Sequence, residues 1–365
     1  MTSPEPHQSS RDSLKRGADT EFPRTVAITG GAGFLGTHLV ALLRSRHPAT
    51  SVRIADLLRE PPADFDPAVT WFGGADILDS PSLLSALEGA EAVVHLAGLV
   101  SFWRADRARL FAINRDGTRN VLLACARAGA KRLVHVSSAA TIGFTDDPDH
   151  PVDEALAFDW SRVTGKHYMC SKRAGELELQ DADRQGVSAV IANPASMYGP
   201  GDTRNTHRLF QAIQRGVIRA IPPGGNNVAD VRDVAEGLYR LLRSQARNER
   251  FILGGQNLTF GEINGTIAAE LGVARARRTI PRPLRRPLCA AVRVAEWLPG
   301  RPAVIAADDL ESSFYYRYYS SAKAGTRLEW VPRYTFAQTV RDAAADLSAR
   351  GLLAPFDPPA ARSVS

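Results

Sequence analysis

The sequence predicts an α/β protein built on a doubly wound parallel sheet, and two features of its first half carry that prediction. Short runs rich in β-branched residues alternate with segments of helical apolar periodicity, an order that is typical of parallel strands covered by helices on both faces. The first run is followed at once by a glycine-rich turn and a helical segment. The expected strands are residues 25–29, 51–56, 69–72, 92–98, 132–138 and 188–194.

The helical segments and the C-terminal half complete the expected architecture. Helical periodicity is clearest at 34–46 (FLGTHLVALLRSR) and at 107–129, each of which lies between two expected strands. Beyond residue 195 the alternation becomes irregular, with a helical pattern at 231–244, a short strand at 250–255 and an amphipathic stretch at 260–271. We therefore expect a smaller, discontinuous C-terminal lobe.

The composition bears on the cellular compartment of the protein and on whether a metal site is expected. The chain has 365 residues, 44% of them hydrophobic, which is ample for a large core. Its three cysteines, Cys125, Cys170 and Cys289, form no CxxC or Cys/His cluster, so we expect no disulfide framework and no metal site. A reducing cytoplasm is the default location. No run of about 18 apolar residues is present, so no membrane-spanning helix is expected.

The charge pattern argues against nucleic acid as a partner. The net charge is +6 and the pI is 9.4, but the basic residues are dispersed and are not interleaved with aromatic residues. One local excess of arginine at 274–300 flanks an apolar stretch, which offers a peripheral contact to a membrane surface or a lid over a hydrophobic pocket. An ordinary arginine-rich surface helix is the alternative interpretation.

The glycine turn TGGAGFLG predicts a dinucleotide site. It places Gly30, Gly33 and Gly36 directly after the first strand and at the start of the first helix, where backbone N–H groups can face a pyrophosphate. Asp56 ends the second strand twenty residues after Gly36, the spacing at which a carboxylate meets the adenosine ribose hydroxyls. A strand-end cap is the alternative role for Asp56.

The same residues indicate which dinucleotide is bound. The carboxylate of Asp56 would accept hydrogen bonds from a free 2′-hydroxyl and repel a 2′-phosphate, so NAD is favoured. NADP is the alternative, because Arg59 could contact a phosphate if its loop folds back. Asp76 and Ile77 follow the third expected strand and should lie near the adenine.

A tyrosine and a lysine in the segment GKHYMCSKRAGE stand four residues apart. If this segment is helical, Tyr168 and Lys172 lie on one face, one turn apart. An adjacent ammonium favours the phenolate, so we expect Lys172 to draw the pKa of Tyr168 down toward neutrality. A pair at this spacing is also compatible with an ordinary surface helix.

Taken in order, these motifs resemble the extended short-chain dehydrogenase/reductase, or NAD-dependent epimerase/dehydratase-like, family over about residues 25–345. The resemblance rests on the glycine turn and on HLAG (95–98), NRDGTRN (114–120), VSSAATIG (136–143), YMCSK (168–172) and NPASMYGPGD (193–202). It implies a Rossmann-type domain and a substrate lobe, with the site between them.

Composition and the resemblance together give a domain plan. Residues 1–24 are polar and rich in Ser, Pro and charge, so we expect a disordered tail there. The dinucleotide-binding domain is expected at 25–195, with 226–254 returning to it. The substrate lobe covers 196–225 and 255–345, and a flexible tail covers 346–365. The oligomeric state stays open, although family members are often dimers through helices such as those around 105–128 and 163–184, which makes a homodimer one candidate assembly.

Carried over by position, the resemblance implies roles for single residues. Tyr168 is the general acid/base, Lys172 its activator and a holder of the nicotinamide ribose, and Ser138 the hydroxyl that bonds the reacting oxygen. Asn114 has either a helix-stabilising or a proton-relay role. The implied cofactor-binding residues are Gly30, Gly33, Phe34, Leu35, Gly36, Asp56, Asp76, Ile77, Leu96, Ala97, Gly98, Asn114, Tyr168, Lys172, Pro194 and Met197.

Departures from the family pattern bear on the reaction. Ala139 and Ala140 follow Ser138 where sugar-nucleotide dehydratases carry an Asp-Glu couplet, so elimination of water is not expected. Asn226 and Asn227 lie where sugar-nucleotide members usually carry an arginine that clamps the diphosphate.

A third departure adds apolar residues after the fourth strand, among them Val100, Phe102 and Trp103, as in the dihydroflavonol reductase and 3β-hydroxysteroid dehydrogenase branches. We expect an apolar substrate-binding wall and a secondary alcohol or ketone of steroid, polyketide or flavonoid size. A nucleotide-sugar 4-epimerase with tightly bound NAD is the alternative, and a non-enzymatic NAD-binding regulator is disfavoured by the intact serine, tyrosine and lysine. The preference for arginine over lysine is compatible with a GC-rich genome and with secondary metabolism, and no other expectation depends on it.

Overall fold

The computed structural model describes residues 22–63, 65–297, 305–354 and 356. Most of the expected N-terminal tail, residues 1–21, lies outside these ranges, as do residues 298–300 at the end of the arginine-rich stretch and most of the expected C-terminal tail. Within the described ranges, none of the helices combines the length and the apolar character that a membrane crossing requires.

A seven-stranded sheet organises the larger domain, and all its strand pairs are parallel. The strand order is β10-β6-β5-β4-β1-β2-β3, so the chain winds outward from β1 in both directions. This confirms the predicted fold class. The strands are β1 (Thr25–Thr29), β2 (Ser51–Asp56), β3 (Thr70–Gly73), β4 (Ala92–His95), β5 (Arg132–Val136), β6 (Ser188–Pro194) and β10 (Arg250–Leu253).

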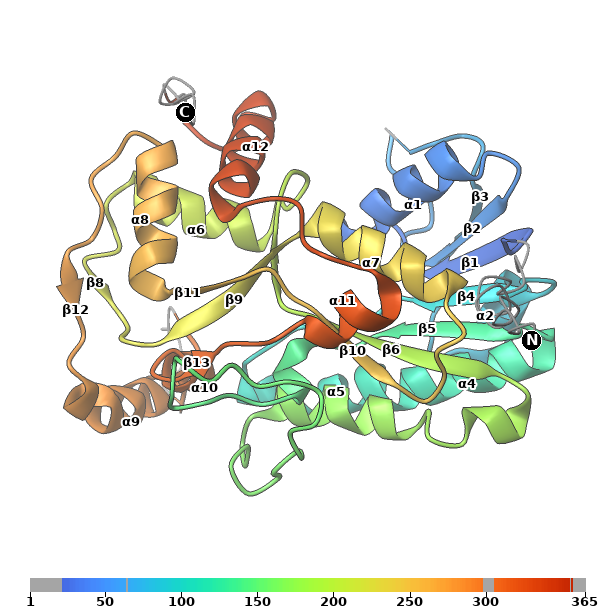
Figure 1. Ribbon diagram of the computed structural model, residues 1–365, viewed down its shortest axis with the longest axis horizontal. Helices are drawn as coiled ribbons and strands as arrows, with labels where there is room; N and C mark the ends of the chain where they lie inside the picture. Colours follow the sequence, from blue (N-terminus) through green and yellow to red (C-terminus); the bar gives the residue numbers. More distant parts are fainter. Residues whose placement is uncertain (1–21, 64, 298–304, 355, 357–365) are drawn as a thin grey trace, which may run out of the picture.

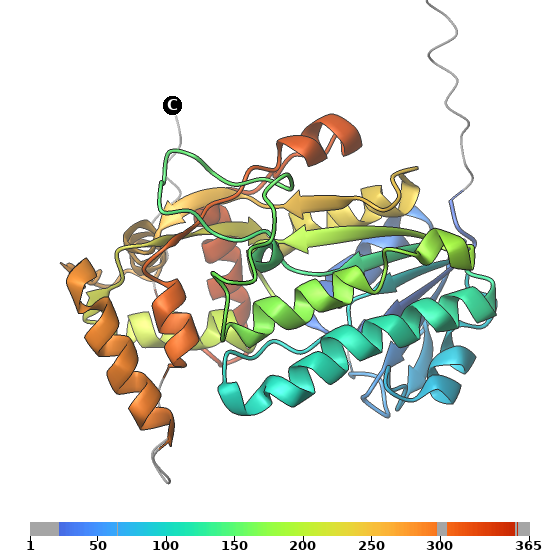
Figure 2. The same cartoon turned by 90° about the horizontal axis from the view of Figure 1, so that it is seen from below.

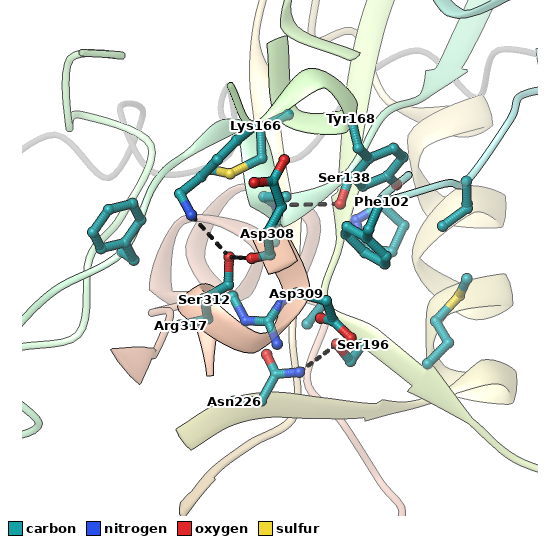
Figure 3. A pocket seen from close by; sticks show the side chains of 18 of the residues that line it. Phe102, Ser138, Lys166, Tyr168, Ser196, Asn226, Asp308, Asp309, Ser312 and Arg317 are labelled. Atoms are coloured by element: carbon teal, nitrogen blue, oxygen red, sulfur yellow. Dashed lines mark hydrogen bonds between the residues drawn. The ribbon is translucent and has the colours of Figure 1, made fainter. Parts of the chain in front are cut away.

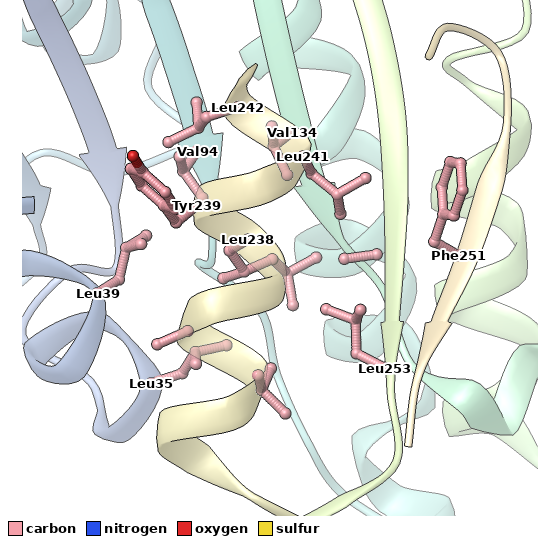
Figure 4. Packing of buried hydrophobic residues seen from close by; sticks show 14 of the residues in the cluster. Leu35, Leu39, Val94, Val134, Leu238, Tyr239, Leu241, Leu242, Phe251 and Leu253 are labelled. Carbon is pink, nitrogen blue, oxygen red and sulfur yellow. The ribbon is translucent and has the colours of Figure 1, made fainter. Parts of the chain in front are cut away.

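Helices cover both faces of this sheet (Figure 1). On one face lie α1 (Phe34–Arg46) and α7 (Val231–Arg243), whose apolar side chains meet those of the strands (Figure 4). On the other lie α2 (Ser80–Leu87), α4 (Gly117–Ala128) and α5 (His167–Leu177), with α4 and α5 side by side (Figure 2). The central strands β4 and β5 are buried along their whole length, as expected of strands covered on both faces.

The smaller lobe has its own sheet and core. Strands β11 (Gln256–Thr259), β9 (Gly225–Asp230) and β13 (Tyr316–Arg317) lie side by side, and β7 (Ser196–Tyr198) also pairs with β9. A buried cluster joins this sheet to three helices, α6 (Asn205–Gln214), α8 (Phe260–Glu270) and α12 (Phe336–Ala349). The remaining elements are α3 (Arg107–Phe111), β8 (Ala220–Ile221), β12 (Arg278–Thr279), α9 (Arg285–Trp297), α10 (Ala307–Ser312) and α11 (Ala322–Leu328).

The domain boundaries differ from the predicted ones in the middle of the chain. Strand β9 starts before residue 226 and pairs only with strands of the small sheet, so the return to the large domain begins with α7. Residues 322–330, expected in the substrate lobe, instead pack on the large domain. Trp330 is 1% exposed in its core, and its indole Nε1 donates to the carbonyl of Asp233 on α7 at 2.8 Å.

Part of each predicted tail packs on the rest of the protein. Phe22, expected in the N-terminal tail, stacks on His47 with ring centroids 3.7 Å apart. Helix α12 continues past residue 346 to Ala349, because Leu347 and the following Leu353 are buried in the core of the small lobe.

Candidate active site

The glycine turn joins β1 to α1 in a conformation that side chains would obstruct. Gly30 has φ of 69°, and a Cβ on it would lie 2.8 Å from backbone atoms of Ala97 at the end of β4. A Cβ on Gly36 would lie 2.4 Å from the carbonyl oxygen of Gly31. Helix α1 begins after Gly33 with no side-chain cap, so its first N–H groups are free to face an anionic ligand.

Asp56 lies beside this turn, as its spacing predicts. Its carboxylate accepts hydrogen bonds from the N–H groups of Ala32 and Leu58, both at 3.2 Å, so it both ends the strand and presents oxygens next to the turn. Ile77 is buried, and its carbonyl accepts a hydrogen bond from Asn120 of α4 at 3.0 Å. Asp76 precedes it after the end of β3, while Arg59 is exposed.

Asn114 holds the chain after β4 against α5. Its side-chain oxygen accepts from the N–H of Leu99 at 2.8 Å, and its Nδ2 donates to the carbonyl of Leu99 at 2.9 Å and to Ser171 Oγ at 3.0 Å. A Cβ on Gly98 would come within 3.2 Å of both Asn114 Oδ1 and Lys172 Nζ. These contacts favour the structural role of Asn114, and the residues from Leu96 to Gly98 pass close to Lys172.

Ser138 and Tyr168 meet at the carboxyl end of the large sheet. Ser138 follows β5, where its hydroxyl accepts a hydrogen bond from Ala140 N at 3.2 Å. A hydrogen bond with Ser138 lowers the pKa of Tyr168, but burial raises it by more. The pKa of Tyr168 therefore lies above its ordinary value, and the predicted downward shift is wrong, because desolvation of the phenolate is the larger effect.

Lys172 lies one turn along the same helix and is directed to the strand rather than to solvent. It is 4% exposed, and its Nζ donates to the carbonyl of Val136 at 2.9 Å. Burial lowers its pKa to about 8, although Glu176 opposes that shift.

Glu176 is a positioning residue that the sequence analysis missed. It is 2% exposed, and it accepts hydrogen bonds from Thr141 Oγ1 at 2.6 Å and Asn193 Nδ2 at 2.7 Å. Asn193 also donates to the carbonyl of Ser138 at 3.0 Å, so β6 and α5 together fix the backbone that carries the serine. The spacing of Glu176, four residues after Lys172, was the available signal.

A cavity of about 400 Å³ opens in front of Ser138 and Tyr168 (Figure 3). Its wall near Tyr168 is aromatic and apolar: the ring of Phe102 meets that of Tyr168 edge-on, with centroids 5.5 Å apart. Val100 also lines the cavity, but Trp103 does not, so the structure places only two of the three predicted wall residues there. The other apolar lining residues are Phe34, Ala139, Ala140, Phe144, Met169, Pro194, Ala195, Met197, Tyr198, Leu209 and Tyr319.

The cavity wall formed by the substrate lobe and by Lys166, which precedes α5, is polar, and no motif predicted it. Lys166 donates to Ser312 Oγ at 3.2 Å, and Asp308 and Asp309 line the cavity from α10. Arg317 lines it from β13, where its backbone pairs with that of Asn226 on β9. The cavity thus contains a guanidinium beside Asn226, although Asn226 and Asn227 stand at the sequence positions where sugar-nucleotide members usually carry an arginine. The pairing joins residues that are distant in sequence.

The sequence pattern of the NAD dependent epimerase/dehydratase family matches residues 26–254, which include the glycine turn, Ser138, Tyr168 and Lys172.

This chain belongs to the NAD-dependent epimerase/dehydratase family.

Relatives with curated names place dehydrogenases and reductases near this family member. A Synechocystis sp. protein named "Putative dihydroflavonol 4-reductase" is 32% identical over 87% of this chain and 92% of its own length. The Arabidopsis thaliana "3beta-hydroxysteroid-dehydrogenase/decarboxylase isoform 2" is 28% identical over 89% of this chain and 62% of its own. Among solved structures, a UDP-glucose 4-epimerase of Thermus thermophilus in complex with NAD superposes with a TM-score of 0.69 at 22% identity, covering 89% and 99% of the two chains. At this level of identity, the likeness shows only that the two chains share a fold.

The residues of this family member fit NAD. Gly30 keeps the turn clear of a side chain, the start of α1 offers uncapped N–H groups, and Asp56 supplies carboxylate oxygens beside the turn. The donor set matches a pyrophosphate followed by a ribose diol. The chain is thus an NAD-dependent enzyme of the extended short-chain dehydrogenase/reductase type.

Proposed function

We propose that this enzyme interconverts a secondary alcohol and a ketone on a largely apolar small molecule of steroid, polyketide or flavonoid size. The observation that carries the proposal is that Ser138 and Tyr168 line the cavity next to an apolar wall, in which the ring of Phe102 contacts that of Tyr168. Aromatic and aliphatic walls bind rings through their apolar area, with few polar contacts to fix orientation. The names of the two curated relatives support the same class of reaction.

Tyr168 and Ser138 have different roles in the proposed proton transfer. Tyr168 exchanges a proton with the substrate oxygen, and Ser138 donates a hydrogen bond to the same oxygen. Because burial raises the pKa of Tyr168, the phenol stays protonated at neutral pH, which is the form that protonates a ketone oxygen during reduction. In the opposite direction the hydrogen bond from Ser138 favours the phenolate before the alcohol binds, and the single O–H of Ser138 is then donated to the substrate oxygen. Lys172 would hold the nicotinamide ribose, and bound NAD supplies the carbon that accepts or returns hydride.

A nucleotide-sugar 4-epimerase that keeps its NAD bound is the second candidate, and one observation favours it. The guanidinium of Arg317 in the cavity could contact a diphosphate. Against it, three carboxylates line the same cavity, those of Asp202, Asp308 and Asp309, and a diphosphate would bring further negative charge next to them. Clear binding of UDP-glucose, measured by calorimetry, would favour the epimerase.

A phenylalanine substitution tests the proton transfer. Tyr168→Phe should lower kcat for ketone reduction by about 10²- to 10⁴-fold, because the proton donor is lost, while NADH still binds with an affinity close to that of the wild type. The matched control is Tyr319→Phe, which removes a buried cavity phenol that donates to the carbonyl of Gly143. Turnover by Tyr168→Phe at the level of Tyr319→Phe would contradict the assigned role.

A further inference from the structure

Three charged side chains lie on the substrate-lobe wall of the cavity, and the charge of Lys166 acts on one of them, Asp308, at longer range than a salt bridge. Asp308 and Asp309 on α10 and Arg317 on β13 line the cavity (Figure 3). In the described part of the chain, no residue forms a side-chain hydrogen bond or an ion pair with any of the three. Arg317 Nε is also buried from solvent and has no hydrogen-bond acceptor among the described residues. Buried polar groups are nearly always paired, so Arg317 is a candidate for a ligand contact, and the half-buried carboxylates of Asp308 and Asp309 line the same cavity.

Their polar neighbours in the same wall are already paired. Lys166 donates to Ser312 Oγ at 3.2 Å and lies 3.9 Å from a carboxylate oxygen of Glu311. Asn226 donates to Ser196 Oγ at 2.6 Å. The carboxylate of Asp202 accepts from the N–H and the hydroxyl of Thr206, at 2.9 and 2.7 Å. Among the charged side chains that line the cavity, those without such a partner in the described part of the chain are therefore Asp308, Asp309 and Arg317.

The charges of this wall select the kind of group that fits. The cavity is lined by two cations, Lys166 and Arg317, and by three carboxylates, so an anionic group would be repelled by at least as much charge as attracts it. A hydroxyl can donate to a carboxylate and accept from a guanidinium at the same time. Such hydrogen bonds to charged groups are stronger than those between neutral groups. An uncharged hydroxyl uses both kinds of free group without adding charge.

We infer that the substrate bears an uncharged, hydroxyl-carrying group away from its reacting carbon, and that Asp308, Asp309 and Arg317 bind it. This inference rests on the proposed function and deepens it: the wall near Phe102 and Tyr168 receives the apolar rings and the reacting oxygen. The substrate lobe binds the far, hydroxylated end. Arg317 and Asp309 are specificity-determining residues in this assignment.

Matched ketones that differ only at the far end test the inference. One pair is 5α-androstan-3-one and 17β-hydroxy-5α-androstan-3-one, and a second is flavanone and 4′-hydroxyflavanone. Binding to the NAD-loaded enzyme is measured by calorimetry and reduction by NADH consumption. In at least one pair the hydroxylated ketone should bind about tenfold or more tightly than its partner, as expected for a hydrogen bond to a charged group. The preference should fall to near twofold or less in Arg317→Met and Asp309→Asn, and it should persist in Arg219→Met, which changes an exposed arginine of the same lobe.

The outcomes separate this inference from the proposed function. Equal binding within both pairs, or a preference that survives in both cavity variants, would overturn the inference even if all four ketones are reduced. A hydroxyl preference that depends on Arg317, without reduction of any ketone, would support the inference and contradict the proposed reaction. Tighter binding of 3-oxo-5α-androstane-17β-carboxylate than of the hydroxyl ketone would overturn the uncharged class, and so would Arg317-dependent binding of UDP-glucose.

Discussion

Burial moves Tyr168 and Lys172, one helical turn apart, toward their uncharged forms. It raises the pKa of the phenol and lowers that of the ammonium to about 8. Ser138 is the group whose hydrogen bond acts against burial at the tyrosine. The serine thus has two effects at this site, one on the substrate oxygen and one on the proton affinity of Tyr168.

The first prediction concerns that serine. Ser138→Ala should lower the rate in both directions by about 10²-fold, the usual cost of a lost hydrogen-bond donor to the reacting oxygen. In alcohol oxidation the rate rises with pH until Tyr168 is deprotonated, so a raised pKa in the variant should move the plateau to higher pH. Because the pKa of Tyr168 lies above its ordinary value of about 10, rates of NAD reduction from about pH 8 to about pH 11.5 measure this shift. Ser137→Ala is the control, since the buried hydroxyl of Ser137 has no hydrogen-bond partner among the described residues; equal pH profiles for the two variants would contradict the role given to Ser138.

Single residues differ in how far the sequence could identify them. Ser138, Tyr168 and Lys172 stand in short motifs, so position alone indicated their roles. The direction of the pKa shift at Tyr168 depends on how much protein surrounds the phenol, and no motif contains that information. Arg317 stands about 150 residues after Tyr168 and reaches the cavity only through the pairing of β13 with β9.

At the scale of elements, the turn between β1 and α1 depends on close backbone approach. A side chain at Gly30 would meet the backbone of Ala97, whereas nothing lies within 4 Å of the equivalent position on Gly74, which has φ of 73°. Both glycines adopt the left-handed conformation. Only Gly30 combines it with crowding at the cofactor turn.

The second prediction separates the free-energy cost of a left-handed backbone from the cost of crowding against Ala97. Gly74→Ala should lower the free energy of unfolding by about 1–2 kcal/mol, the cost of a left-handed side chain. Gly30→Ala should cost more than that and should weaken NAD binding at least tenfold, because the turn must move away from Ala97. Urea unfolding and calorimetry with NAD measure both quantities. Equally tight binding of NAD by Gly30→Ala and Gly74→Ala would contradict the claim that a side chain at Gly30 forces the cofactor turn away from Ala97.

The central strands β4 and β5 carry a pair of buried histidines. His95 and His135 have ring centroids 5.1 Å apart, and the ring nitrogens of His135 have no hydrogen-bond partner among the described residues. Burial lowers the pKa of His95 to about 3 and that of His135 well below its ordinary value. Both rings are therefore neutral in the folded protein near neutral pH.

The third prediction follows from this pair. Below about pH 6.5 the unfolded chain binds protons that the folded histidines do not, so stability should fall as pH decreases, by about 1.4 kcal/mol per pH unit for each histidine. His135→Leu should reduce the slope of the free energy of unfolding against pH by about 1.4 kcal/mol per pH unit between pH 6 and pH 4.5. Urea unfolding at several pH values measures this slope. His150→Leu, at a histidine whose side chain is 84% exposed, should leave the slope as it is. An unchanged slope in His135→Leu would show that this ring does not cause the acid sensitivity.

Elements of the large domain could be predicted more closely than those of the small lobe. The alternation of buried strands and amphipathic helices repeats a local pattern, so α1 was predicted with the bounds that the structure shows. The strands β7, β11 and β13 were not predicted because each has four residues or fewer, and β9 was not predicted because it begins with Gly225, Asn226 and Asn227, residue types that are depleted in strands. The polar wall of the cavity was not predicted because Arg317 reaches it through the pairing of β13 with β9, two strands that are distant in sequence.

At the scale of the whole molecule, the chain passes between its two domains several times. The large domain takes α7 and β10 from the second half of the chain, and it also takes residues 322–330 with Trp330. The small lobe is completed only by α12 and the residues after it, since Leu347 and Leu353 belong to its core. The cavity between Tyr168 and Arg317 therefore depends on segments from most of the chain.

The fourth prediction tests the contribution of the C-terminal segment. A chain that ends at residue 345 loses Leu347 and Leu353, each worth about 1.5–3 kcal/mol of buried apolar surface, and the hydrogen bond from Gln211 to the carbonyl of Leu352. Its thermal unfolding temperature should fall by several degrees relative to a chain that ends at residue 356. If the two truncated chains melt together, residues 346–353 do not stabilise the lobe.

The decisive test of the proposed reaction is the stoichiometry of NADH consumption against product formation, over many turnovers with apolar ketones and with UDP-glucose. We expect one NADH oxidised for each alcohol formed from at least one ketone of steroid or flavonoid size, with cofactor that exchanges between turnovers. We also expect no conversion of UDP-glucose. Conversion of UDP-glucose to its 4-epimer without net consumption of NADH, by protein that retains nearly one NAD per chain, would show that the enzyme is an epimerase instead.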